Sequence, residues 1–344
     1  MIMIFSVKEE CIMFSRKHVF YLLLLLAVCL AFSGCQKQTD DPEKPVVYFF
    51  QAKDFVLMKT NMATGVTTPL CDDPLCEHGN DCRFSNSHSP YLVGTTVYFY
   101  REAGIFMEED QAFMTTQICS YDYDSGKYTV IREINHSNKE NVCGKFEVYN
   151  GNIYFYQQTL VDNRVQFSLR QINIATNELT EYNWTTKTWH FAIYNDRLYF
   201  SDTVNGIYST DFALNDQQYL VQPAENQLVY ARCLDQSGNL YYVEKGEDKR
   251  ETLMLYAPET GSKTVIDTSD SITFIKVVGG SVFYLKAQYG EDGQLTQGCT
   301  IYRWDHGESQ SFYVSDHELT TLQACENYII ADDTEGNRHV FLIE

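Results

Sequence analysis

The chain has 344 residues, and 26 lysines and arginines stand against 46 aspartates and glutamates, for a formal net charge of −20. The phosphates of nucleic acids and of anionic lipids repel such a chain, so we expect no nucleic-acid partner. Hydrophobic residues make up 44% of the sequence, with 25 tyrosines and 21 phenylalanines, so there is ample material for a large core.

The first 34 residues are predicted to be an export signal. Arg16, Lys17 and His18 precede the apolar run VFYLLLLLAVCLAF at 19–32, which ends in small residues. This run is shorter than the about 20 apolar residues that a membrane-spanning helix needs. Because two glutamates at 9–10 fit a signal poorly, translation from Met13 is an alternative to translation from Met1.

The sequence AFSGC at 31–35 resembles the lipobox of bacterial lipoproteins, with Phe32 where Leu is usual. The resemblance implies that Cys35 becomes the N-terminus and carries a lipid anchor on the extracytoplasmic face of the cell membrane. An ordinary secretory signal is the alternative. Residues 35–45 are polar and charged and end in a proline, as in a tether. The signal holds three basic and two acidic residues, so its removal leaves a charge of −21, and we expect the domain to stand off the membrane.

Residues 46–344 are predicted to form one all-β domain built from repeats. Tyrosine-rich and phenylalanine-rich runs recur at intervals of 42 to 56 residues: VVYFF (46–50), TVYFY (96–100), NIYFY (152–156), RLYFS (197–201), NLYYV (239–243), SVFYL (281–285) and NYIIA (327–331). Most runs follow a pair such as Asn150-Gly151 or Gly279-Gly280, which tolerates the positive φ angles of tight hairpins.

Each repeat reads as four short antiparallel strands, because segments such as RQINIATNELTEY (170–182) follow the aromatic runs as strand, turn and strand. Four strands in 40 to 50 residues are typical of a propeller blade. Both faces of the runs are apolar, as expected of a sheet between two neighbours. We predict a seven-bladed β-propeller of four-stranded blades, closed by strands from both termini in one sheet; six or eight blades, or two stacked β-domains, are the alternatives.

The repeats and the element C-x-D-P-x-C-x-H at 71–78 resemble TolB-like and low-density-lipoprotein-receptor-like propeller domains in lipoproteins of Gram-positive bacteria. This resemblance implies the fold alone, and it implies no mechanism.

The segment at 71–82 gathers Cys71, Cys76, His78 and Cys82 between the first two repeats. Thiolates and an imidazole suit a structural Zn²⁺, although the spacing C-x4-C-x-H-x3-C lacks paired C-x2-C knuckles. Export also permits a disulfide within the loop. A disulfide, a metal site and unpaired thiols are therefore the alternatives, and the first two would fasten the loop for stability.

Trp184, Trp189 and His190, in the stretch NWTTKTWHF, and Arg232 are the predicted ligand contacts. Tryptophan faces stack on sugar rings, but the same side chains could instead wedge between blades. There is no G-x-S-x-G or HExxH motif. We predict a monomeric binding or scaffold module for a glycan, peptide or protein partner. The alternatives are a glycan-active hydrolase or lyase with its site at the propeller axis, and a structural envelope protein.

Overall fold

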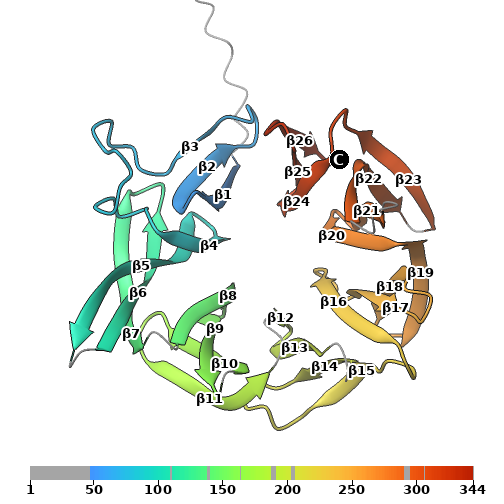
Figure 1. The fold of residues 1–344 in the computed structure, drawn as a ribbon, viewed down its shortest axis with the longest axis horizontal. Helices are drawn as coiled ribbons and strands as arrows, with labels where there is room; N and C mark the ends of the chain where they lie inside the picture. The colour runs from blue at the N-terminus through green and yellow to red at the C-terminus, as the bar shows by residue number, and fades with distance from the viewer. Residues whose placement is uncertain are drawn as a thin grey trace, which may run out of the picture. The chain divides into compact units, whose positions relative to one another are not determined.

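The computed structural model describes residues 47–108, 111–137, 140–162, 164–186, 191–202, 206–289, 295–305 and 307–343. These residues form seven antiparallel sheets arranged in a ring (Figure 1). The predicted seven-bladed β-propeller is confirmed. None of the described residues belongs to a helix that is long and apolar enough to span a membrane. The signal (1–34), Cys35 and the tether (35–45) lie outside the described residues and stay predictions.

The five middle sheets have four strands each, in chain order from the centre of the ring outward (Figure 1). The second sheet comprises β4 (Ser87–Val93), β5 (Thr96–Glu108), β6 (Gln111–Asp122) and β7 (Lys127–Ser137). The third comprises β8 (Glu140–Tyr149), β9 (Asn152–Val161), β10 (Arg164–Asn173) and β11 (Leu179–Thr186). The fourth comprises β12 (Phe191–Tyr194), β13 (Arg197–Asp202), β14 (Gly206–Thr210) and β15 (Gln218–Val221). The fifth comprises β16 (Leu228–Leu234), β17 (Leu240–Lys245), β18 (Glu251–Ala257) and β19 (Ser262–Ser269). The sixth comprises β20 (Ser271–Val278), β21 (Ser281–Tyr289), β22 (Leu295–Asp305) and β23 (Glu308–Val314).

The first and last sheets have three strands each among the described residues. The first comprises β1 (Tyr48–Lys53), β2 (Val56–Asn61) and β3 (Thr67–Pro69). The last comprises β24 (Leu319–Cys325), β25 (Tyr328–Asp333) and β26 (Arg338–Leu342). The aromatic run is the second strand of each middle sheet. Among residues 47–343, as far as the structure describes them, no strand precedes the run in the first sheet and no fourth strand completes the last sheet.

The aromatic runs are buried on both faces, as their composition predicts. In β21, the neighbouring side chains Phe283 and Tyr284 point to opposite faces, and both are fully buried. Phe283 packs into a cluster with Leu319 and Ile329 of the last sheet, whereas Tyr284 packs into a cluster with Tyr241 of the fifth sheet. The sixth sheet is therefore held between its two neighbours by its own aromatic strand.

The predicted hairpin turns have the expected backbone. Asn150 and Gly151 have φ angles of 46° and 71°, and Gly279 and Gly280 have φ angles of 59° and 84°. Two successive positive φ angles are those of a type I′ turn, whose twist matches the twist of the flanking strands. These turns join the innermost strand to the aromatic strand and set their register.

Side chains, rather than a shared strand, join the first and last sheets. The predicted closure by strands from both termini in one sheet is wrong for the described residues, because β1 pairs only with β2 and β26 only with β25. The Arg338 guanidinium on β26 donates to Asp332 in its own sheet, with 2.7 Å from Nε to Oδ1. It also donates to Gln51, Thr60 and Thr67 of the first sheet at 2.9–3.0 Å. One arginine thus fastens the seam of the ring.

Candidate metal centre

The cysteine-rich segment lies between β3 and β4, so it connects the first two sheets as predicted. Its end returns to the start of β2: the Leu57 amide donates to the Phe84 carbonyl at 2.9 Å, and the Ser87 amide donates to the Phe55 carbonyl at 2.9 Å. Between these two hydrogen bonds, Val56 and Ser85 pair in an isolated antiparallel β-bridge. The loop is therefore closed by backbone pairing at its base, and its middle section holds the cysteines.

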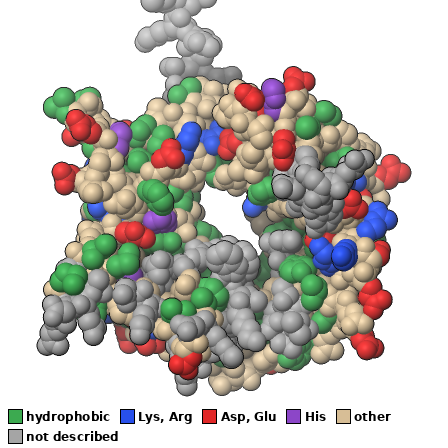
Figure 2. Space-filling model, viewed as in Figure 1, with side chains coloured by type: hydrophobic (Ala, Val, Ile, Leu, Met, Phe, Trp, Pro, Cys, Tyr) green, Lys and Arg blue, Asp and Glu red, His purple; other side chains and the backbone are tan. Residues whose placement is uncertain are grey.

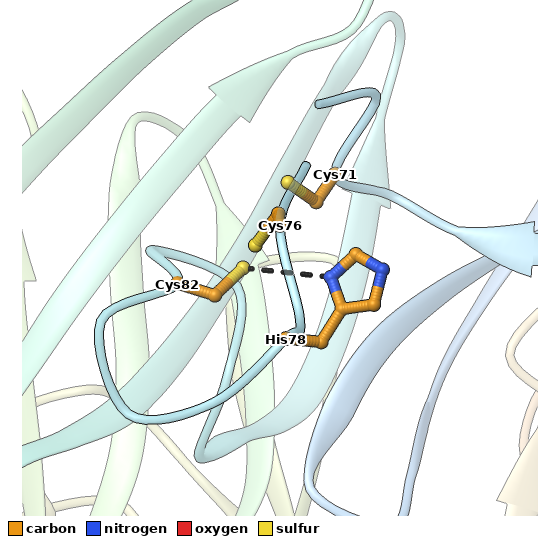
Figure 3. A group of neighbouring side chains, drawn as sticks. All are labelled: Cys71, Cys76, His78 and Cys82. Carbon is orange, nitrogen blue, oxygen red and sulfur yellow. Dashed lines mark hydrogen bonds between the residues drawn. The ribbon is translucent and has the colours of Figure 1, made fainter. Parts of the chain in front are cut away.

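Cys71, Cys76, His78 and Cys82 converge on one point (Figure 3). Their three sulfur atoms and one imidazole nitrogen all lie within 4.8 Å of one another. The distance from Cys82 Sγ to His78 Nδ1 is 3.9 Å. Bond lengths of about 2.3 Å to sulfur and about 2.0 Å to nitrogen in a tetrahedral Zn²⁺ site would place these atoms about 3.6–3.8 Å apart. A small contraction would therefore bring all four ligands to bonding distance.

The turns of the loop explain how these ligands meet. The Asp73 carbonyl accepts from the Cys76 amide at 3.1 Å, and the Gly79 carbonyl accepts from the Cys82 amide at 2.9 Å. His78 has a positive φ of 54°, a conformation in which histidine is enriched among non-glycine residues. The Ser85 hydroxyl donates to the His78 carbonyl at 2.6 Å and holds this conformation. Local backbone bonds thus turn the imidazole toward Cys82.

The ligand cluster lies on a hydrophobic core. Cys82 is buried at 5% exposure within a cluster that includes Leu57, Leu70 and Phe84, and Cys71 and Cys76 pack against that cluster while half-buried. A buried thiolate without a nearby cation is costly, whereas a bound metal cation offsets the charge. The surroundings therefore suit a metal that is part of the fold.

The thiols of the cluster differ in acidity. Burial, together with the neighbouring thiols of Cys76 and Cys82, raises the pKa of Cys71 to about 11. Burial also opposes ionisation of Cys82, but hydrogen bonds from His78, the Phe84 amide and the other two thiols outweigh it and lower its pKa to about 7. Cys82 is therefore the first of this pair to become a thiolate, which is the form that binds a metal.

The geometry favours a metal site over a disulfide. The structure describes the side chains of seven cysteines, and none of these seven forms a disulfide. One disulfide would use two of the loop sulfurs at about 2.05 Å and would leave the third sulfur and the imidazole without a role. A four-ligand site accounts for every member of the cluster. No other group of three or more candidate ligands occurs in the described part of the chain.

The other predicted contact residues are only partly described. Trp184 belongs to β11 and Arg232 to β16, but the structure does not describe their side chains. Trp189 and His190 lie outside the described residues altogether. Ligand contact at these four positions therefore stays a prediction.

The innermost strands share an irregularity that the sequence did not predict. β4, β8, β16, β20 and β24 each shift register against the second strand of their sheet. Ser89 and Phe274 lie in two of these shifts with positive φ angles of 49° and 53°, and Arg232 lies in a third. Bulges bend a strand and redirect its side chains. These strands surround the opening at the centre of the ring in Figure 2.

Solved structures share this fold at low sequence identity. An oligogalacturonate lyase in complex with manganese is 9% identical with a TM-score of 0.60, covering 83% of this chain and 81% of that one. The oligogalacturonate lyase of Vibrio parahaemolyticus is 8% identical with a TM-score of 0.60, covering 86% and 90%. The β-propeller domain of the trilobed protease from Pyrococcus furiosus, which has an open velcro topology, is 14% identical with a TM-score of 0.53, covering 83% of each chain.

No family model matches this chain, and no curated protein matches it in sequence. At such identities the similar structures show the propeller fold alone.

Proposed function

We propose that this protein is a lipid-anchored, extracytoplasmic binding or scaffold module that presents a propeller to a glycan, peptide or protein partner. One observation carries the proposal: the metal-ligand cluster of the described residues has four protein ligands. Catalytic zinc sites keep a position open for water or substrate, whereas four protein ligands make a closed, structural site. The cluster therefore serves the stability of a presenting surface.

The metal that the four ligands would hold is Zn²⁺. Three cysteine sulfurs and one imidazole form a soft donor set, which suits zinc better than the oxygen-preferring Mg²⁺ or Ca²⁺. When bound, zinc would tie the segment after β3 to the segment before β4. These residues would then join the first two blades in addition to their apolar packing.

The anchor would be Cys35, in the sequence AFSGC. A diacylglycerol on this residue would hold the chain at the membrane, and residues 36–45 would separate the domain from the headgroups. The net charge, −21 once the signal is removed, supports this separation, since anionic headgroups would repel the domain. A Cys35→Ser variant is expected to lose fatty-acid labelling and to leave the membrane fraction. Retention of label would contradict the anchor.

A glycan-active enzyme is the second candidate, because two of the similar structures are oligogalacturonate lyases. Its site would lie at the axis, where the bulged innermost strands meet. Incubation with oligogalacturonate, followed by ultraviolet absorbance of the unsaturated product, tests this activity. Product formation that grows with the amount of protein would favour the enzyme over the binding module.

Metal analysis of the full-length chain tests the closed site. We expect about one zinc per chain, retained on dialysis, and loss of that zinc in Cys76→Ser and His78→Ala. Cys299→Ser is the matched control, since Cys299 is a half-buried free cysteine outside the cluster, and it should keep the metal. A glycan array with the same protein then asks whether the propeller binds sugars. Zinc loss in the control, or none in the cluster variants, would contradict the proposal.

A further inference from the structure

We propose that Tyr313 is a nucleophilic tyrosine that accepts an acyl group from an activated ester, with His339 as its general base and Asp333 as the residue that positions His339. The three side chains lie where the sixth and last sheets meet (Figure 1). Tyr313 belongs to β23, the outermost strand of the sixth sheet, His339 belongs to β26, and Asp333 ends β25. The site shares no residue with the cysteine cluster, so the inference adds an activity to the proposed binding module.

A chain of hydrogen bonds joins the three side chains. The Tyr313 hydroxyl lies 3.0 Å from His339 Nδ1, and His339 Nε2 lies 3.2 Å from Asp333 Oδ2. The Tyr313 ring also packs against the rings of His339 and Phe341, with centroid distances of 5.1 and 4.8 Å. A nucleophile within hydrogen-bond reach of a base, which a third group in turn orients, is the arrangement that activates weak nucleophiles.

The carboxylate at the end of this chain is held rigidly by the turn between β25 and β26. Asp333 Oδ1 accepts from the amides of Glu335 and Asn337 at 3.0 and 2.8 Å, and Oδ2 accepts from the Asn337 side-chain amide at 3.1 Å. Burial opposes ionisation of Asp333, but these hydrogen bonds, with that from His339, outweigh it and lower its pKa to about 2. Asp333 is therefore a fixed anion beside the imidazole.

This anion decides which nitrogen of His339 carries the proton. An ionised carboxylate accepts hydrogen bonds and donates none, so the contact with Asp333 requires a hydrogen on Nε2. In the neutral imidazole Nδ1 is then the acceptor, and the Tyr313 hydroxyl donates to it. His339 is thus held in the tautomer that can take the proton of the phenol, as the histidine of a catalytic triad takes the proton of its nucleophile.

A second copy of the same turn shows what the histidine adds. The sequences DQSGNLY (235–241) and DTEGNRH (333–339) have the same spacing, and in both the aspartate accepts from the backbone and side-chain amides of the asparagine. In the first copy the seventh residue is Tyr241, whose hydroxyl donates directly to Asp235 at 3.2 Å, and burial together with this carboxylate raises the pKa of Tyr241. The turn forms without a histidine, so the imidazole of His339, placed between a carboxylate and a phenol, points to chemistry.

The phenol and its base are within reach of a dissolved reagent, since the His339 side chain is 24% exposed and Tyr313 is half-buried. The Tyr313 oxygen would bond to the acyl carbon of an activated ester while its proton moves to His339 Nδ1. The bond from the acyl carbon to the leaving oxygen breaks, and the leaving group takes that electron pair. His339 then gives the proton to the leaving group, so the product is an ester of Tyr313.

Incubation of the full-length chain in detergent with p-nitrophenyl acetate, followed by peptide mass spectrometry, tests this inference. We expect acetylation of Tyr313 at least about 100-fold faster than acetylation of Tyr219, because a positioned general base contributes about 10²–10⁴-fold. Tyr219 on β15 is the internal control: it is 51% exposed, so exposure alone would make it the faster of the two. Tyr313→Phe keeps the aromatic ring and should remove the label from this peptide.

Two variants separate the base from the residue that positions it. His339→Gln keeps a polar side chain beside the phenol but removes the base, so acetylation of Tyr313 should slow to about the rate of Tyr219. Asp333→Asn should slow it as well, and nitrogen NMR of the histidine side chains should show that His339 loses its preference for a proton on Nε2. Acetylation of Tyr313 no faster than of Tyr219 in the wild-type chain, which depends on no variant, would overturn the inference, as would an unchanged rate in His339→Gln.

Discussion

Replacing Arg338 with methionine tests whether one side chain closes the ring. The side chains of Arg338 and Asp332 are only 16% and 21% exposed, so solvent screens their ion pair weakly. The substitution leaves the Asp332 carboxylate without its cation and removes donors from Thr60, which is fully buried, and from Thr67. Removing one partner of a buried pair costs about 3–5 kcal/mol. Because this pair is partly exposed, we expect the free energy of unfolding to fall by about 3 kcal/mol.

Urea denaturation followed by circular dichroism measures this loss. Arg197→Met is the control, because Arg197 also pairs with an aspartate, Asp216, at 2.8 Å, but within one sheet and with the Asp216 side chain 53% exposed. An exposed pair is worth at most about 1 kcal/mol. Arg338→Lys should lie between wild type and Arg338→Met, since lysine keeps the charge but not the planar fork of donors. If Arg338→Met lost no more stability than Arg197→Met, the seam would not depend on this arginine.

Three further predictions test the packing and the titration of the propeller. Phe283→Ala should lower the free energy of unfolding by about 3–5 kcal/mol, because the ring is fully buried between sheets. Phe55→Ala is the control, because Phe55 is 63% exposed and its loss should change the stability little. If the two variants lost the same small amount of stability, the packing of both faces would be contradicted. Gly238→Ala should lower the thermal midpoint more than Gly261→Ala: both glycines have positive φ, but only at Gly238 would the added Cβ lie 2.3 Å from the Tyr194 ring, so equal midpoints would count against that contact. Burial raises the pKa of Cys119 from 9.0 to about 11. Between pH 9 and pH 11 this thiol therefore ionises in the unfolded chain before it ionises in the folded chain, so the free energy of unfolding should fall as the pH rises through this range. Cys119→Val should therefore lose less stability than wild type over that range in urea titrations, and parallel pH profiles would contradict the assignment.

The aromatic runs made the fold predictable from sequence. Phe283 and Tyr284 are adjacent, so a strand must send them to opposite faces, and only a sheet with two neighbours buries both. The pairs Asn150-Gly151 and Gly279-Gly280 marked the turns because few residues tolerate positive φ. These signals are local, and they repeat, so their spacing revealed the number of blades.

The seam could not be predicted in the same way. Arg338 lies more than 270 residues after Thr60 and Thr67 in the sequence, and nothing near it marks the contact. In sequence, a last repeat with three strands also has the pattern expected of a sheet that is completed by a strand from the other terminus. Closure by side chains depends on contacts between residues near the two ends of the chain, and the period of the repeats does not reveal such contacts.

The sequence predicted where the ligand cluster lies, but it did not predict whether the cluster binds a metal. The sequence located Cys71, Cys76, His78 and Cys82 in one connection and left a disulfide, a metal site and unpaired thiols as alternatives. The feature that favours a metal site is the positive φ of His78, which turns the imidazole toward Cys82. This conformation depends on the Ser85 hydroxyl and the return of the chain to β2, so the spacing alone did not reveal it.

X-ray absorption at the zinc edge of the full-length chain tests the central claim most directly. A site built from Cys71, Cys76, His78 and Cys82 predicts about three sulfur ligands at 2.3 Å and one nitrogen ligand at about 2.0 Å, with about one zinc per chain. A chain that holds no zinc, together with a mass spectrum that shows a disulfide between two of these cysteines, would contradict the account.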